Sequence, residues 1–351
     1  MLKEIIIEKI KKHGPIPFDE FMEMALYFPE LGYYSKNDIK IGKQGDFFTA
    51  SHLGSVFGFL LSKEIKNLYK KLNCPQNFTV TEIGPGMGYL AKDLLDESSI
   101  NLRYNLVEIN PSMRKIQRQH LNPYLDKTQW YNSIEELSPF RGVFICNEVF
   151  DALPVRVFEI YDSKEVMEIY VDFKNDELIE IFLPCRTDTL QYIKEFAPWV
   201  LKIKGYRSEV NLKMKFLIET MSKKLENGYV LIFDYGYNSQ EYYHPDRTKG
   251  TLLCYHKHTI NENPYINIGK QDITAHVNFT ALKKWAEESG FKCEGYFSQS
   301  EYLISLCNET VLKEIYQRNL IQSFKRLVLP QGMGESHKVM ILSKNLDSHF
   351  R

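Results

Sequence analysis

A glycine-rich turn between a strand and a helix is the strongest chemical signal in the amino-acid sequence. The segment reads EIGPGMG over residues 82–88, after a strand-like run and before a helix that starts at Tyr89. Gly84, Gly86 and Gly88 lack Cβ atoms, so the backbone can turn sharply and approach a ligand. A carboxylate at Glu82 would repel a pyrophosphate but would attract a cationic amino-acid end. The turn therefore predicts a nucleotide-type ligand that carries a cationic group.

A second acidic residue follows at a meaningful distance. The next strand-like run, 102–108, ends at Glu108, twenty residues after Gly88. A carboxylate at the end of that strand can accept hydrogen bonds from both hydroxyls of a ribose. NAD and S-adenosylmethionine both contain such a ribose, so Glu108 favours an adenosine ligand and leaves both open.

A third group of polar residues lies at the end of the buried strand predicted over 142–147. Asn147, Glu148 and Asp151 stand at or just after its carboxyl end, which is where ligands bind in open α/β sheets. The two carboxylates could clamp a guanidinium group and orient its nitrogen. The alternative is an ordinary polar helix start.

Further along the chain, Asp272 and His276 are four residues apart. If this segment is helical, the two side chains share a face, and the histidine could accept a proton near neutral pH. The alternative is a loop with ordinary hydrogen bonds. His256 and His258 have no third ligand in view, and no Cys-x-x-Cys pair occurs, so we expect no metal site.

The elements that must position these residues follow an α/β pattern. Strand-like runs alternate with helices from residue 77 onward, which predicts a parallel sheet with helices on both faces. Runs at 155–161, 166–173 and 178–183 are too close together for parallel crossovers and predict an antiparallel excursion. Other strands are expected at 228–234, 291–297 and 338–343, and helices at 3–12, 18–27, 53–71, 188–196, 209–226, 279–289 and 309–323.

We accordingly predict two regions. Residues 1–75 form an N-terminal helical and loop segment that contributes to the site, and residues 76–351 form a Rossmann-like domain. Within the second region, 155–226 and 235–278 are insertions that build a subdomain on the substrate side.

Composition narrows the class of protein. The 44 Lys and Arg residues balance 45 Asp and Glu residues, which gives no reason to expect a nucleic-acid partner. No apolar run reaches 18 residues, so no membrane insertion is expected. The N-terminus has neither the apolar stretch of a signal peptide nor the acid-poor composition of a transit peptide, so we expect a cytoplasmic protein.

Six segments occur in a specific order along nearly the whole chain. They are YFPELGYY at 27–34, GDFFTA at 45–50, EIGPGMG at 82–88, NEVFDALP at 147–154, GTL at 250–252 and QDITAHV at 271–277. With this set the sequence resembles the MidA family of S-adenosylmethionine-dependent methyltransferases. The resemblance implies a Rossmann-like methyltransferase core with an N-terminal helical segment and inserted and C-terminal α+β elaborations.

The resemblance also suggests how the ligand is held. Glu82 and the glycine turn would bind the methionine end of S-adenosylmethionine, Glu108 the ribose, and Asn132 and Ser133 the adenine. Asn147 would also face the ligand, and the loop containing Gly45, Asp46 and Thr49 would fold over it. Glu148 and Asp151, with Asp272 and His276, would handle the substrate.

The mitochondrial members of this family are similar to protein arginine methyltransferases that act on a subunit of respiratory complex I. The chain begins at the family's first helix, so we expect the bacterial type, with a protein substrate of the respiratory-complex kind. A homodimer is left open. Two other functions stay as alternatives: a non-catalytic assembly factor that binds S-adenosylmethionine, and an NAD-dependent oxidoreductase.

Four places depart from the family pattern. Ser51-His52 replaces Pro-Glu, Leu253 replaces Arg, Asn278 replaces Asp, and Ser336-His337 replaces an apolar-aromatic pair. The cofactor motifs are intact, so these departures bear on the substrate and not on the methyl donor.

Overall fold

The computed structural model, which describes residues 1–36, 55–162 and 165–346, divides the chain into two units. Unit 1 comprises Met1–Ile39, Phe150–Phe216 and Gly236–Leu282, and unit 2 comprises the rest. The sequence-based boundaries differ from this division, because the predicted N-terminal segment 1–75 is split between the units. No helix within the described ranges is both long and apolar enough to cross a membrane.

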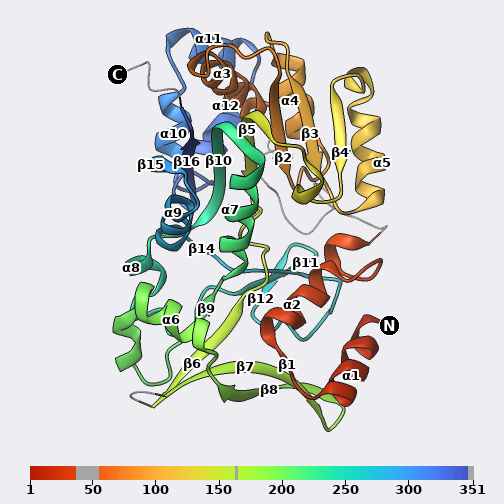
Figure 1. Cartoon of the computed structure of the whole chain (residues 1–351), viewed down its shortest axis with the longest axis vertical. Coiled ribbons are helices and arrows are strands. Elements are labelled where there is room, and N and C mark those ends of the chain that lie inside the picture. Colours follow the sequence, from red (N-terminus) through yellow and green to blue (C-terminus); the bar gives the residue numbers. More distant parts are fainter. Residues whose placement is uncertain (37–54, 163–164, 347–351) are drawn as a thin grey trace. The chain divides into compact units, whose positions relative to one another are not determined.

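Unit 2 is built on a largely parallel sheet with the strand order β15-β16-β10-β5-β2-β3-β4 (Figure 1). The five neighbouring strands β10, β5, β2, β3 and β4 run parallel to one another. Strand β16 is antiparallel to both β10 and β15. The predicted α/β class is confirmed. The strands are β2 (Phe78–Ile83), β3 (Arg103–Val107), β4 (Thr128–Tyr131), β5 (Phe140–Asn147), β10 (Leu225–Tyr237), β15 (Lys292–Ser298) and β16 (His337–Lys344).

Helices flank this sheet, and Figure 1 shows α4 and α5 beside β2, β3 and β4. Apolar residues of α3 and α4 share one core with β2, β3, β5 and β10. The single helix predicted over 309–323 is wrong, because the chain leaves helical geometry near Asn319, whose φ is 57°. The helices are α3 (Val56–Lys71), α4 (Tyr89–Glu97), α5 (Pro111–His120), α10 (Gln299–Ser305), α11 (Glu309–Gln317) and α12 (Ile321–Val328).

Unit 1 contains the predicted antiparallel excursion. Strands β6 (Arg156–Asp162), β7 (Glu165–Lys174) and β8 (Glu177–Pro184) pair in sequence order, and all of these pairings are antiparallel. Two further strands complete this sheet: β1 (Ile16–Pro17) pairs with β7, and β9 (Arg207–Val210) pairs with β6. The helix predicted over 209–226 is therefore wrong at its start, since pairing with β6 keeps the first residues extended; helix α7 is Lys213–Lys224.

A second, smaller sheet in unit 1 has the order β12-β11-β13. The N-terminal helices α1 (Leu2–His13) and α2 (Phe18–Tyr27) share a core with this sheet and with β6 and β7. The remaining elements are β11 (Leu253–His256), β12 (Thr259–Asn261), β13 (Asp272–Thr274), β14 (Val277–Asn278), α6 (Thr187–Phe196), α8 (Ser239–Tyr242) and α9 (Phe279–Glu288).

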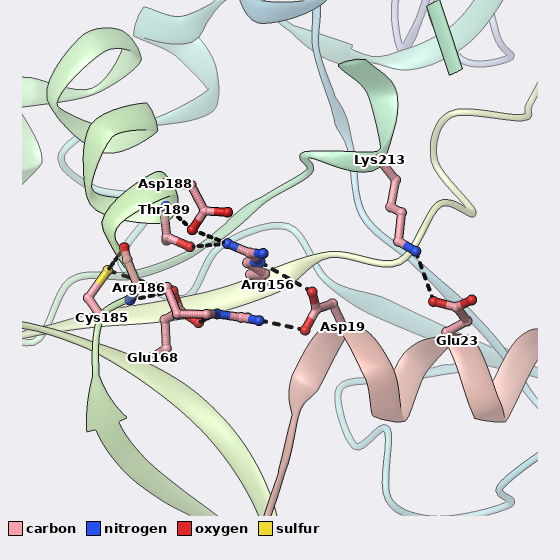
Figure 2. Close-up of polar contacts among 9 residues, drawn as sticks. All are labelled: Asp19, Glu23, Arg156, Glu168, Cys185, Arg186, Asp188, Thr189 and Lys213. Atoms are coloured by element: carbon pink, nitrogen blue, oxygen red, sulfur yellow. Dashed lines mark hydrogen bonds and ion pairs between the residues drawn. The ribbon is translucent and has the colours of Figure 1, made fainter. Parts of the chain in front are cut away.

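A network of ion pairs ties α2 to β6 and β7 of the larger unit 1 sheet and to the start of α6 (Figure 2). The Asp19 carboxylate accepts hydrogen bonds from Arg156 Nε and Arg186 Nη2, each at 3.2 Å. Arg186 Nε also donates to Glu168 at 2.6 Å, and Arg156 Nη1 donates to Asp188 at 2.6 Å. Glu168 is only 1% exposed, so its carboxylate is buried in unit 1, where the hydrogen bond from Arg186 compensates its charge.

We expect that Glu168→Ala will destabilise unit 1 by about 2–3 kcal/mol, because it leaves the half-buried Arg186 guanidinium without its closest partner. Glu165→Ala, at an exposed position on the same strand, is the matched control and should have little effect. Thermal unfolding followed by circular dichroism measures both. Equal melting temperatures for the two variants would contradict the expected role of Glu168.

The same network borders a cavity of about 350 Å³ in unit 1. Asp19, Arg156, Asp188 and Lys213 supply the charges of its lining, and each of them belongs to an ion pair. The lining thus offers no unbalanced charge among the described residues that would select a charged ligand.

Candidate active site

The carboxyl ends of four parallel strands meet at one edge of the unit 2 sheet. Ile83 of β2 lies opposite Val107 of β3 and Cys146 of β5, and Asn147 lies opposite Phe233 of β10. The residues that come next along each strand are therefore neighbours across the edge. Ligands bind at this edge in α/β sheets. It gathers the glycine turn, Glu108, Asn147 and Glu148 from three separate segments of the sequence.

The glycine turn has the backbone geometry that the sequence predicted. Gly84, Gly86 and Gly88 have φ values of 62°, 52° and 78°, in the left-handed region that side-chain-bearing residues rarely adopt. A Cβ atom added to Gly86 would meet no atom of a described residue within 4 Å. The backbone at Gly86 thus borders open space, as a ligand-binding turn requires.

Glu82 lies on β2, two residues before this turn, and is 3% exposed. Burial raises the pKa of its carboxyl to about 7, and a hydrogen bond from Tyr104 Oη at 2.7 Å opposes that rise only in part. A buried carboxylate that is costly to ionise gains from a cationic ligand group. This environment is compatible with the role predicted for Glu82 at the methionine end of the donor.

Glu108 follows β3 and is 9% exposed, and burial raises its pKa to about 7. Its two oxygens each accept one hydrogen bond, from the Asn110 amide at 2.8 Å and from Gln117 Nε2 at 3.2 Å. A carboxylate has about four acceptor sites, so capacity remains for ribose hydroxyls.

Gln117, on α5, is a residue that the sequence analysis missed. Its side chain is buried and joins three parts of the edge: it donates to Gly86 O at 2.7 Å and to Glu108, and it accepts from Trp130 Nε1 at 2.9 Å. A single glutamine on a helix gives no sequence signal for such a role. In the fold it holds the glycine turn and the candidate ribose acceptor at a fixed separation.

We expect Gln117→Leu to weaken binding of S-adenosylhomocysteine about tenfold, because a similar volume is kept while two hydrogen bonds that position the site are lost. Gln119→Leu, at an exposed position on the same helix, is the matched control. Isothermal titration calorimetry measures both dissociation constants. Unchanged affinity in Gln117→Leu would show that the turn and Glu108 hold their positions without it.

The predicted adenine-binding residues lie past the end of β4. Asn132 is exposed, and its side chain donates to Glu136 Oε1 at 2.7 Å and accepts from Arg114. Ser133 precedes a short 3-10 helix and does not cap it with its side chain. Their role stays a prediction. Gly45, Asp46 and Thr49 lie outside the described residues.

Glu148, the first residue after β5, has an unusual backbone. Its φ is 53°, and its amide donates to Phe233 O at 2.8 Å. The next amide, of Val149, donates to Asp234 Oδ2 at 3.1 Å. Non-glycine residues in this conformation cost about 1–3 kcal/mol and cluster at functional sites. Asp234, buried in the last part of β10, was missed as a site residue, although an acid that follows an apolar run is a readable signal.

Asp151 and Asp272 lie together in unit 1. The Asp272 carboxylate accepts from Tyr34 Oη, with both oxygens at 2.9 Å. Burial, followed by the negative charges of Asp272 and Asp151 among others, raises the pKa of Tyr34 well above its ordinary value. The Asp151 carbonyl accepts the Ala275 amide at 3.0 Å. The helix considered for 272–277 is wrong, because Asp272–Thr274 forms strand β13 on β11.

His276 is positioned through a second buried acid. Its amide donates to Thr251 Oγ1 at 3.0 Å, and Glu209 accepts from both the Thr251 amide and hydroxyl, at 3.0 and 3.1 Å. Gly250 has φ 75°, and a Cβ there would lie 2.1 Å from Glu209 Oε1. The GTL motif is thus a loop wrapped around Glu209, which the sequence analysis missed because Glu209 is far from it in the chain.

One departure from the family pattern has a local explanation. Asn278 Oδ1 accepts from the amides of Thr280 and Ala281 at the start of α9, and its Nδ2 donates to Tyr192 Oη at 2.8 Å. An aspartate could accept the first two bonds but could not donate the third.

The edge of the unit 2 sheet fits S-adenosylmethionine by its chemistry. It offers two buried carboxylates, an open left-handed glycine turn, and Asn147 Oδ1, which is buried and takes no hydrogen bond from any residue that the structure describes. A donor group of a ligand would satisfy that oxygen. In the described part of the chain, no three His, Cys, Asp or Glu side chains are grouped so that they could hold a metal ion.

Comparison with known proteins supports the same ligand. Across 94% of the chain and 84% of the relative, the sequence is 27% identical to the protein arginine methyltransferase NDUFAF7, mitochondrial, of Danio rerio. It is 24% identical to the NDUFAF7 homolog of Drosophila melanogaster, over 97% of the chain and 85% of the relative.

Among solved structures, a COG1565 superfamily member from Burkholderia thailandensis bound to S-adenosyl-homocysteine is similar with a TM-score of 0.87. It is 28% identical, and the likeness covers 99% of this chain and 92% of the other. A model of the family described as "Putative S-adenosyl-L-methionine-dependent methyltransferase" matches residues 60–297, well over half of the chain. The chain belongs to this family, and it is an S-adenosylmethionine-dependent methyltransferase.

Proposed function

We propose that this enzyme methylates a guanidinium nitrogen of arginine in a protein. The observation that carries the proposal is the placement of Glu148, a carboxylate in a strained backbone conformation directly beside the donor turn. A Cβ at Gly84 would lie 3.5 Å from Val149 Cγ2, so the turn that bears Glu148 packs on the glycine turn. The relatives from Drosophila melanogaster and Danio rerio are named protein arginine methyltransferases, which supports the same acceptor.

Methyl transfer of this kind depends mainly on positioning. S-adenosylmethionine, when bound, supplies a methyl group on a positively charged sulfur. The chain must then hold a nucleophilic nitrogen in line and exclude water, which can contribute about 7–11 kcal/mol. A guanidinium has a pKa above about 12 and stays charged, so Glu148 would orient it through bidentate hydrogen bonds and stabilise its charge.

Roles for the unit 1 residues are part of the proposal. Asp151, Asp272 and His276 would contact the substrate. The Tyr34–Asp272 hydrogen bonds and the Glu209-centred loop support this, since both give these side chains fixed positions.

The identity of the acceptor protein is proposed from the resemblance of the sequence to the MidA family. We propose a subunit of a respiratory complex, with complex I as the first candidate, and a cytoplasmic enzyme. Purified enzyme with methyl-labelled S-adenosylmethionine should label a protein in a lysate of the host, and mass spectrometry should place the label on arginine.

The result can separate the remaining alternatives. Label on lysine or on a small molecule would overturn the arginine proposal. No label at saturating donor would favour a scaffold that binds S-adenosylmethionine without turnover. The Gln117→Leu variant, which keeps Glu148 but binds the donor more weakly, serves as the control, because its labelling should recover when the donor concentration is raised.

A further inference from the structure

His337 is a buried histidine that has no role in the methyl transfer proposed above. It is the first residue of β16, opposite Tyr235 of β10, and β10 lies next to β5. This places it at the strand edge that bears Glu148. Its side chain is about nine-tenths buried, and its ring lies 5.6 Å from that of Tyr235.

The two ring nitrogens of His337 have different surroundings. Nδ1 lies 3.0 Å from Ser336 Oγ, within hydrogen-bond distance. Nε2 is buried, has no hydrogen-bond partner among the described residues, and lies 3.8 Å from Glu148 Oε1. A buried polar atom without a hydrogen-bond partner is uncommon, because it lowers the stability of the folded protein. Its presence here therefore suggests a function.

The charged and titratable groups around His337 come from three segments. Glu148 faces it from the turn after β5, and the other groups are Asp234 and Tyr235 of β10 and Lys338 and Glu335 of its own segment. Glu301 of α10 interacts with Lys338, the next residue. Asp234 accepts the amides of Tyr235 and Val149, and Lys338 donates to Glu335 O. Glu148 is the group that Nε2 reaches.

We propose that His337 is a positioning residue that receives, through Glu148, the proton released in methyl transfer. This rests on the proposed arginine chemistry. The acceptor nitrogen forms a bond to the methyl carbon, the bond from that carbon to sulfur breaks with its electron pair going to sulfur, and the nitrogen loses one proton. Glu148 takes this proton and passes it to Nε2, and the imidazolium releases it to water after the product leaves.

Ser336 selects the form of the ring that can do this. If its hydroxyl oxygen accepts a hydrogen bond from Nδ1–H, the proton of the neutral ring is on Nδ1, and Nε2 keeps a lone pair directed toward Glu148. The return of Glu148 to its charged form then does not depend on water reaching a carboxylate that is mostly buried. The pair Ser336-His337 thereby acquires a role at the site from a place near the end of the chain.

The test uses the full-length enzyme and the acceptor protein found by methyl labelling. His337→Phe keeps the aromatic contact with Tyr235 but removes Nε2. It should lower kcat about tenfold and change the dependence of kcat on pH, with KM for the donor unchanged. Ser336→Ala should lower kcat about threefold and keep the wild-type dependence on pH. His13→Phe, at an exposed position, is the control.

A second measurement does not need turnover. In protein with 13C-labelled histidine rings, the His337 signal is identified by its loss in His337→Phe. It should shift in Glu148→Gln, because the carboxylate beside Nε2 is replaced. An unshifted signal overturns the pairing, and so does a kcat profile of His337→Phe with the wild-type dependence on pH. If wild-type enzyme labels no arginine while the signal still moves, the proposed function fails and the pairing stands.

Discussion

Replacing Glu82 with Gln is expected to stabilise the ligand-free enzyme at pH 8 and to abolish its response to S-adenosylhomocysteine. Burial raises the folded-state pKa of Glu82 to about 7, from an ordinary value of 4.5. The folded protein therefore binds a proton more tightly than the unfolded chain, and stability falls as the pH rises from about 4.5 to 7. At pH 8 the wild-type protein has lost about 3 kcal/mol of its free energy of unfolding in this way. The Gln variant is neutral at every pH and does not have this loss.

The same substitution should also weaken binding of the methyl donor. The charged carboxylate is the partner expected for the cationic end of the donor, so wild-type affinity should rise as the pH rises from 6 to 8. A ligand at 100 times its dissociation constant stabilises the native state by about 2.7 kcal/mol, a shift that Glu82→Gln should lack.

Differential scanning fluorimetry at pH 5 and pH 8, with and without ligand, measures both effects. Glu226→Gln, at an exposed position in unit 2, is the control and should behave as wild type. A variant that keeps the full ligand-induced shift would remove Glu82 from the cofactor site. A variant less stable than wild type at pH 8 would show that the Tyr104 hydrogen bond outweighs the cost of burial.

Replacing Glu148 with Gln is expected to lower methyl transfer at least 100-fold with no change in S-adenosylhomocysteine affinity. Gln has the same shape and the same backbone cost at φ 53°, so the substitution removes only the charge that orients the guanidinium. Single-turnover assays with labelled donor measure the transfer step, and calorimetry measures the affinity. Glu309→Gln, at an exposed position, is the control.

A second substitution at this position separates strain from chemistry. Glu148→Gly accepts a positive φ without cost and should raise the free energy of unfolding by about 1 kcal/mol while being equally inactive. Full transfer in Glu148→Gln would rule out the orienting role, and a large loss of donor affinity would place Glu148 in the cofactor site instead.

Much of the local structure could be read from the sequence because its causes are local. The apolar run Phe78–Ile83, the glycines after it and the helix that begins at Tyr89 are adjacent, and each carries its own signal. Pro111 after Asn110 marks the start of α5 in the same way, and Asn110 does cap it. The placement of Glu108 and Asn147 at one edge also followed, because parallel strands in such folds all point their carboxyl ends the same way.

Errors arose where tertiary pairing overrode local pattern. The start of the 209–226 prediction is drawn into β9 by its pairing with β6, and Asp272–Thr274 is held extended by β11. In both places the hydrogen bonds to a distant segment decide the conformation.

The sequence by itself determined the family of the fold, the donor turn and the acids at the strand ends, since these depend on residue types a few positions apart. Only the tertiary structure decided that Gln117 joins the turn to Glu108, that Glu209 holds the loop before His276, and that His337 faces Glu148. Those pairs are separated by many residues, and no periodicity or turn chemistry encodes them. They become neighbours only when the strands take their order in the sheets and the buried polar groups must find partners.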